Sequence, residues 1–303
     1  MLRKFVYGVG LLQIGYVGYN ASDYIYRYGI HQNCNLKSIY PQEYALITGA
    51  SQGLGLGYAE ELAKRGYNVI LASRTQKNLE EVAQKLQQKY TNVKIEYRVL
   101  NLENEDPQSY EAFFSQLKKD YDNKIGIFIN NAAAFEKDYL INLTPKQIKS
   151  VIDTNVLGAT FMIQQELKYA IQNSQNDKQK TLLINVGSQK THRGGTQEAN
   201  VYYATKQYMN HLTSCLRDQY KTIDSNIQIV NNSPGYIDSP MLSSFYPNFS
   251  QTFGSYFLDT PQKIAKQTLD QIDADPAVIN GSDKQAFGNI FLSLQAKYQN
   301  LFN

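Results

Sequence analysis

The sequence predicts a doubly wound α/β fold with a parallel sheet, preceded by a hydrophobic N-terminal helix. From Tyr44 onward, short segments rich in apolar residues alternate with amphipathic stretches of helical length. Strands that are apolar on both faces are typical of a parallel sheet covered by helices on both sides. The expected strands are residues 44–48, 68–72, 94–100, 125–130, 181–186 and 227–231.

The stretches between these strands have the length and apolar spacing of helices, as in residues 54–65 and 79–90. Near the C-terminus, Thr260 followed by Pro261 is expected to begin a helix over residues 260–275, because threonine caps helices and proline suits their first turn. Residues 241–258 are expected to be irregular and contain six aromatic side chains. We interpret residues 236–260 as a lid over a hydrophobic substrate, with a plug for the lower core as the alternative.

The turn after the first expected strand has a glycine pattern suited to a dinucleotide. Gly49, Gly53 and Gly55 follow an apolar strand and begin a helix. Glycines at such a turn let the backbone approach a pyrophosphate, which the helix N-terminus then stabilises. The other residues of the expected phosphate-binding turn are Thr48, Ser51, Gln52 and Leu54.

The end of the second expected strand indicates which dinucleotide binds. An acidic residue at this place would bind the ribose hydroxyls of NAD, but the chain has Ser73 and Arg74. A hydroxyl and a guanidinium suit a 2′-phosphate instead. We therefore expect NADP(H) as the cofactor, with NAD as the alternative if Arg74 is only a solvated residue.

Tyr202 and Lys206 lie one helical turn apart, so both side chains are expected on the same helix face. A phenol has a pKa of about 10, and a nearby cation lowers that pKa toward a usable range. Ser188, at the end of the preceding strand, can donate a hydrogen bond to a substrate carbonyl. The pattern predicts hydride transfer with Tyr202 as the proton donor, while Lys206 lowers its pKa and holds the nicotinamide ribose.

In this order, the motifs resemble those of the short-chain dehydrogenase/reductase family over residues 43–275, which implies a Rossmann fold. Residues 130–133, Asn-Asn-Ala-Ala, are similar to the Asn-Asn-Ala-Gly that stabilises the family's central sheet. Asn155 matches the asparagine whose helix backbone holds a proton-relay water in the family. The resemblance thus implies a catalytic tetrad of Asn155, Ser188, Tyr202 and Lys206.

The resemblance also implies further cofactor contacts. Residues 233–235 with 239–241 resemble the Pro-Gly turn and hydroxyl-bearing segment beside the nicotinamide carboxamide. Asn101 stands where many relatives have an aspartate that contacts the adenine. The cofactor-binding residues implied in this way are Asn101, Asn131, Ala132, Tyr202, Lys206, Pro234 and Gly235.

Residues 58–66 and 73–76 are similar to the membrane-bound branch of the family, which contains very-long-chain 3-oxoacyl-CoA reductases and 17β-hydroxysteroid dehydrogenases. This similarity implies NADPH-dependent reduction of a ketone on a lipid, either a 3-oxoacyl-CoA or a steroid-like compound, at the endoplasmic reticulum. Lys190, His192 and Arg193 follow Ser188 and can meet the phosphates of CoA, with a solvated loop as the alternative.

The branch also has a hydrophobic N-terminal segment, and residues 5–22 of this chain contain no charge. As a helix this run would span about 27 Å, close to the hydrocarbon thickness of a bilayer. We expect residues 1–40 to be a membrane-anchoring or interfacial segment and residues 41–303 to be the catalytic domain. A helix that packs on the body of the protein is the alternative.

Composition excludes other classes of function. The formal net charge of +3 is too small for a nucleic-acid-binding surface. The three histidines, His31, His192 and His211, are scattered, so no metal site is expected. Cys34 and Cys215 are far apart and are expected to be free thiols.

A competing hypothesis is an accessory subunit of a membrane complex, for example in a mitochondrial membrane, that holds NADP(H) without turnover. Folds that bind cofactors can be retained for structural roles, so the site must decide between the two. The intact set of Ser188, Tyr202 and Lys206 favours the enzyme. The sequence leaves open whether the chain acts alone, as a homo-oligomer or within a larger complex.

Overall fold

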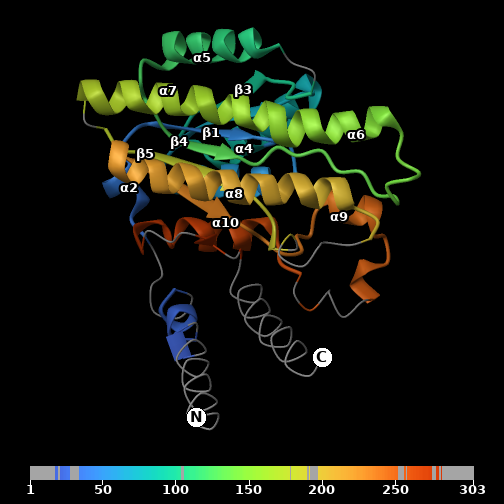
Figure 1. Ribbon diagram of the computed structural model, residues 1–303. Helices are drawn as coiled ribbons and strands as arrows, with labels where there is room; N and C mark the ends of the chain where they lie inside the picture. Colours follow the sequence, from blue (N-terminus) through green and yellow to red (C-terminus); the bar gives the residue numbers. More distant parts are fainter. Residues whose placement is uncertain are drawn as a thin grey trace.

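The computed structural model has a seven-stranded sheet at its centre, with the strand order β3-β2-β1-β4-β5-β6-β7 (Figure 1). It describes residues 18–19, 21–27, 34–103, 106–177, 179–189, 191, 197–251, 256, 258–274, 278–279 and 281. Every pair of neighbouring strands is parallel. The strands are β1 (Tyr44–Thr48), β2 (Asn68–Ser73), β3 (Ile95–Val99), β4 (Ile125–Asn130), β5 (Thr181–Val186), β6 (Ile227–Asn232) and β7 (Val278–Ile279).

Helices cover both faces of the sheet, which confirms the doubly wound fold. Along β1, Ala45 and Ile47 belong to one buried cluster and Leu46 belongs to another, because successive side chains point to opposite faces. The first cluster is completed by helices α3 (Gly53–Lys64), α4 (Gln76–Lys89) and α10 (Pro261–Leu269). The second is completed by α5 (Pro107–Tyr121), α7 (Ala159–Asp177) and α8 (Asn200–Ile223).

Shorter elements connect these layers. They are α2 (Leu36–Ile39), α6 (Pro145–Ile152), the π-helical η2 (Asp153–Gly158), α9 (Pro240–Phe245) and the 3₁₀ turns η4 (Phe249–Gln251) and η6 (Ile272–Ala274). Helix α6 runs directly into η2, which is followed without interruption by α7.

The structure corrects several expected bounds. Helices α3 and α4 begin one and three residues earlier than expected, and α10 ends at Leu269 rather than residue 275. Thr260 caps α10 as expected, accepting a hydrogen bond from the backbone of Lys263 at 3.3 Å. The sequence pattern missed β7, since a two-residue strand has no periodicity of its own.

The segment after β6 begins more regularly than expected. Residues 240–245 form α9, with Ser239 as its N-cap and Pro240 in its first turn. The Ser239 hydroxyl accepts a hydrogen bond from the backbone of Leu242 at 3.3 Å. The expectation of an irregular segment from residue 241 was therefore wrong for this turn, while Phe253 and Phe257 of its aromatic set lie outside the described residues.

Two predicted regions lie largely outside the described residues. These are the uncharged run over residues 5–22, of which only residues 18–19 and 21–22 are described, and the cluster of Lys190, His192 and Arg193. In the part of the chain that is described, no helix combines the length and the apolar character needed to cross a bilayer. Membrane anchoring stays a prediction. The two cysteines are both free thiols, as expected.

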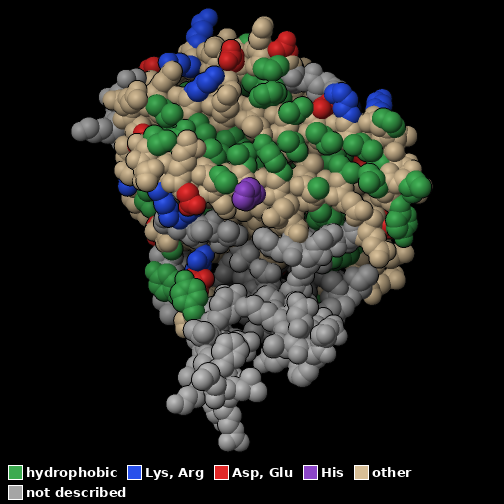
Figure 2. Space-filling view, viewed as in Figure 1, with side chains coloured by type: hydrophobic (Ala, Val, Ile, Leu, Met, Phe, Trp, Pro, Cys, Tyr) green, Lys and Arg blue, Asp and Glu red, His purple; other side chains and the backbone are tan. Residues whose placement is uncertain are grey.

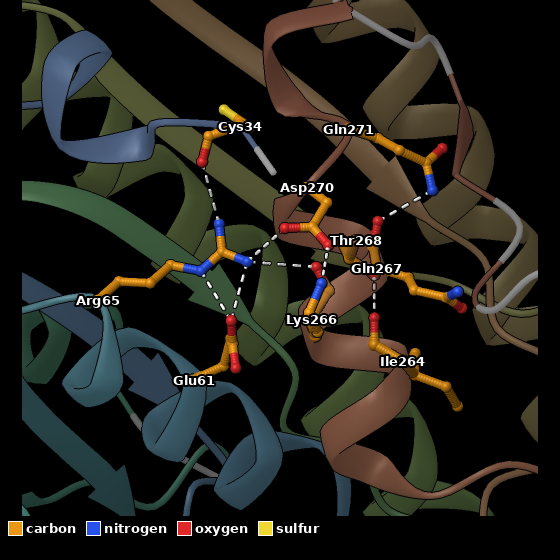
Figure 3. Close-up of polar contacts among 9 residues, drawn as sticks. All are labelled: Cys34, Glu61, Arg65, Ile264, Lys266, Gln267, Thr268, Asp270 and Gln271. Atoms are coloured by element: carbon orange, nitrogen blue, oxygen red, sulfur yellow. Dashed lines mark hydrogen bonds and ion pairs between the residues drawn. The ribbon is translucent and has the colours of Figure 1, made fainter. Parts of the chain in front are cut away.

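An ion-pair network at Arg65 joins α3 to α10 and to the chain before α2 (Figure 3). The guanidinium lies 2.8 Å from a carboxylate oxygen of Glu61 and 2.7 Å from one of Asp270. It also donates to the carbonyl of Cys34 at 3.4 Å, and Lys266 pairs with the second oxygen of Asp270 at 2.5 Å. The Asp270 side chain is only 6% exposed, so the dielectric constant around its carboxylate is low and its attraction to Arg65 is strengthened.

We expect Arg65→Met to lower the free energy of unfolding by roughly 3 kcal/mol, because it removes the guanidinium from two largely buried carboxylates. Urea denaturation followed by circular dichroism measures this loss. Lys168→Met is the matched control, since the Lys168–Glu111 pair is mostly exposed and contributes less than about 1 kcal/mol. Equal losses in both variants would contradict the importance of burial at Arg65.

Candidate active site

The site lies at the carboxyl ends of the strands, where the strand order reverses between β1 and β4. Parallel doubly wound sheets bind ligands in the crevice at this reversal. Here the crevice is an open cleft with a volume of about 330 Å³. Of the predicted site residues, those that line it are Thr48, Gly49, Ser51, Gln52, Gly53, Leu54, Ser73, Arg74, Asn101, Asn131, Ala132, Ser188, Tyr202, Lys206, Pro234 and Gly235.

The glycine turn has the geometry of a phosphate cradle. Gly49 and Gly53 have φ angles of 65° and 57°, in the left-handed region that favours glycine. Gly55 does not line the cleft, and a Cβ there would lie 2.3 Å from the carbonyl oxygen of Gly49. Gly55 therefore lets the helix approach the turn, and its contact with a cofactor stays a prediction. The N-terminus of α3, beginning at Gly53, faces the cleft and suits an anion.

Thr48 and Asn131 join the ends of β1 and β4 beneath the cradle. The Thr48 hydroxyl accepts hydrogen bonds from the backbone amides of Asn131 and Ala132 at 3.0 and 3.1 Å. The Asn131 amide donates to the carbonyls of Thr48 and Gly49 at 3.0 and 3.3 Å. Both side chains are occupied in fixing the cradle, so their main contribution is to position it.

At the end of β2, the cleft has the residues expected to bind the 2′-phosphate. Glu103, an acidic residue that was not expected there, lies beside them. Arg74 is 69% exposed, and its guanidinium lies 3.6 Å from the carboxylate of Glu103. The hydroxyls of Ser51 and Ser73 lie 3.4 Å apart beside it, and Asn101 accepts a hydrogen bond from the Glu103 backbone at 3.1 Å. Because exposed ion pairs are weak, Arg74 can exchange this carboxylate for a phosphate.

Helix α8 brings Tyr202 and Lys206 to the same wall of the cleft. The Lys206 ammonium donates to the carbonyl of Val186 at 2.8 Å and lies 5.8 Å from the centre of the Tyr202 ring. Burial lowers the pKa of Lys206 to about 8, and burial raises the pKa of the Tyr202 phenol above its ordinary value. The raised pKa of Tyr202 has burial as its cause, so the lowering of this pKa by Lys206 stays a prediction.

Ser188 is held by Asn210, a residue that the sequence reasoning missed. The Asn210 amide donates to the Ser188 carbonyl at 3.2 Å, and its oxygen accepts from the Ser233 hydroxyl at 2.9 Å. A Cβ at Gly187 would lie 1.7 Å from that oxygen, so glycine is required there. Asn210 comes four residues after Lys206 on α8, and this spacing is the signal that predicts its place on the same helix face.

Asn155 lies behind the cleft, in η2, rather than on its surface. Its amide donates to the carbonyl of Ala134 at 2.8 Å and to the hydroxyl of Thr205 at 3.0 Å. Its oxygen accepts from the Ala134 backbone at 2.7 Å. A small cavity separates Asn155 from Lys206, and both residues line it. The four predicted tetrad residues thus meet around one end of the cleft.

The predicted lid contributes to the cleft through its first residues. Ile237, Ser239, Pro240 and Met241 line the cleft, and the described aromatic residues that follow, at positions 245, 246, 249 and 256, do not. An aromatic side chain from a different segment, Phe135, packs against Tyr202 and was not anticipated.

Comparison with known proteins agrees with this geometry. The Schizosaccharomyces pombe NADP-dependent 3-hydroxy acid dehydrogenase is 34% identical, covering 64% of this chain and 71% of the relative. The Caenorhabditis elegans very-long-chain 3-oxooacyl-coA reductase let-767 is 26% identical, covering 88% of this chain and 83% of the relative. A solved short-chain dehydrogenase from Sphingobium yanoikuyae in complex with NADPH is 22% identical, with a TM-score of 0.67, covering 86% of this chain and 94% of that chain.

A family model gives the assignment. Residues 43–248, more than half of the chain, match the model described as short chain dehydrogenase. This range includes the glycine turn, Asn155, Ser188, Tyr202 and Lys206. The chain therefore belongs to the short-chain dehydrogenase family.

Proposed function

We propose that this protein is an NADPH-dependent reductase of ketones. The main observation that supports this proposal is that Ser188, Tyr202 and Lys206 line the same cleft as the glycine cradle and Arg74. Gly49 and Gly53 line this cleft with φ angles of 65° and 57°, and a turn of glycines leaves its backbone open to the close approach of a pyrophosphate. The S. pombe relative is NADP-dependent by name, and the solved S. yanoikuyae neighbour holds NADPH.

The residues of the chain can perform the following steps. NADPH, when bound, supplies the hydride for the carbonyl carbon. Ser188 and Tyr202 hold the carbonyl oxygen by hydrogen bonds, and Tyr202 gives that oxygen its proton. The raised pKa of Tyr202 keeps the phenol protonated at neutral pH, which is the form that donates. Lys206, with a pKa of about 8, is still mostly cationic there and stabilises the phenolate that remains.

The proposed substrate is a lipid with a ketone group. The support is the resemblance to the membrane-bound branch, the name of the C. elegans relative and the aromatic side chains after α9. We also propose that residues 1–40 hold the enzyme on a membrane, that of the endoplasmic reticulum by resemblance. An accessory subunit without turnover would not need Ser188, Tyr202 and Lys206 to line one cleft, so the site favours the enzyme.

We propose that the chain forms a homo-oligomer or joins a larger membrane complex, and the surface in Figure 2 is consistent with a protein contact. Hydrophobic side chains gather in a band across the face where α7 and α8 lie. Exposed apolar side chains of η2 and α8 include Leu157, 48% exposed, and Tyr208, 37% exposed. Contiguous apolar surface of this kind is typical of a contact with another protein.

Tyr202→Phe is expected to lower kcat for ketone reduction by roughly 100- to 10,000-fold, because the variant lacks the proton donor. Affinity for NADPH, measured by fluorescence titration, should stay close to that of the wild type. Tyr208→Phe, a change on the exposed side of the same helix, is the control and should retain activity. Undiminished turnover in Tyr202→Phe would refute the mechanism.

Arg74→Ala is expected to weaken NADPH binding by roughly 10- to 100-fold, because a hydrogen-bonded charge pair with the 2′-phosphate is lost. Affinity for NADH should change little. Glu103→Gln should strengthen NADPH binding, since it removes the carboxylate that competes for Arg74. Isothermal titration of both cofactors measures these changes, and equal losses for NADPH and NADH in Arg74→Ala would contradict the assignment.

A substrate panel tests the lipid proposal. Long 3-oxoacyl-CoA esters and steroid ketones should have higher kcat/KM values than small polar ketones, because the apolar side chains of the proposed lid can bury the hydrophobic part of such substrates. NADPH consumption at 340 nm, about the absorption maximum of the reduced nicotinamide, follows the reaction. A preference for small polar ketones would overturn the lipid proposal while leaving the reductase proposal intact.

A further inference from the structure

We propose that Phe135 is a specificity-determining residue, which admits linear ketones to Tyr202 and excludes wide, fused-ring ketones. The inference rests on the proposed reductase function and chooses between its two lipid classes. It concerns the loop over residues 131–144, between β4 and α6.

The rings of Phe135 and Phe245 form an aromatic wall at the end of the site where the substrate is proposed to bind. The ring centre of Phe135 lies 4.6 Å from that of Tyr202, at an interplanar angle of 67°. On its other side, the ring of Phe245 lies 4.6 Å away at 58°. The cleft is lined by Ala134, Tyr202 and Met241, but neither Phe135 nor Phe245 lines it. The two half-buried rings therefore pack beside the Tyr202 ring and fill space that the cleft does not reach.

Lys137 fixes this wall by joining three segments. Its ammonium donates to the carbonyl of Phe245 at 3.1 Å, at the end of α9. It pairs with a carboxylate oxygen of Glu198, just before α8, at 3.2 Å. It also lies 4.3 Å from the centre of the Tyr246 ring, a cation–π contact. A single side chain thus connects the Phe135 loop, the start of the catalytic helix and the first turn of the predicted lid.

The wall has different consequences for the two substrate classes. A linear 3-oxoacyl chain has a cross-section of one methylene group, so it can reach Tyr202 along the existing cleft. A fused-ring ketone is wider than such a chain, so we expect it to displace the Phe135 and Phe245 rings together with the contacts of Lys137. Displacing packed side chains reduces the binding available to the transition state of the wide substrate, and therefore its kcat/KM.

The test compares a 3-oxoacyl-CoA ester with a steroid ketone on the full chain with NADPH. Phe135→Ala should raise the ratio of kcat/KM for the steroid to kcat/KM for the acyl ester by about tenfold or more. Lys137→Met should raise the same ratio by a smaller factor, and Lys137→Arg should restore it, because arginine keeps the charge. The control is Lys146→Met, at an exposed lysine on α6, which should leave the ratio unchanged.

Hydrogen exchange gives a second measurement that does not depend on turnover. Amide exchange in residues 240–246 should become faster in Lys137→Met and not in Lys146→Met, because Lys137 donates to the Phe245 carbonyl at the end of α9 and Lys146 lies on the exposed surface of α6. If the enzyme reduces either ketone and the ratio is unchanged in Phe135→Ala, the role of Phe135 is overturned and the proposed reductase function is retained. A wild-type protein that reduces neither ketone would instead overturn the proposed function, and this inference with it.

Discussion

The structure depends on a backbone-to-backbone contact between the turn after β1 and the turn after β4. A Cβ at Gly49 would lie 2.8 Å from the Cα of Ala132, and one at Gly55 would lie 2.3 Å from the Gly49 carbonyl. The hydrogen bonds between Thr48 and Asn131 hold the two turns in this position. The cradle for a dinucleotide lies on one side of the contact, and the loop that carries Ala134 and Phe135 begins on the other. A larger side chain at either glycine would move both halves of the site at once.

The second constraint is the polar interior beneath α8. Lys206 and Asn210 are both nearly buried, and burial of a charge or an amide is costly unless its hydrogen bonds are satisfied. The partners come from β5, β6 and the turns that follow them: the Val186 carbonyl, the Ser188 carbonyl and the Ser233 hydroxyl. These contacts connect the position of the catalytic helix to the edge of the sheet. They explain why one helix can align the proton donor while its other residues hold the walls of the cleft.

The sequence predicted the elements whose signal is local. Strands β4 and β5 match their expected ranges because each has a mostly apolar run and ends at a recognisable turn. Strand β7 is only two residues long, and α9 was hidden in a segment rich in aromatic residues although Ser239 and Pro240 are ordinary signals of a helix start.

The same distinction applies to the site. The sequence predicted the glycine turn and the Tyr202–Lys206 pair because the local spacing of these residues determines what they can bind or do. Phe135 acts on residues that are distant in the sequence, so no local pattern reports its role. The spacing of Asn210 from Lys206 reports its helix face, but not its distant partners Ser188 and Ser233. Thr48 lines the cleft and its hydroxyl binds the backbone of the turn after β4, while its contact with the cofactor stays a prediction.

The protonation states of Tyr202 and Lys206 have a single physical cause. A phenol that gives a proton must be neutral before the transfer. Burial raises the pKa of Tyr202, so the phenol is neutral at physiological pH. Burial lowers the pKa of Lys206 only to about 8, so a cation remains available to stabilise a phenolate. Desolvation under α8 accounts for both shifts, and it leaves the proposed donor in the form that gives a proton.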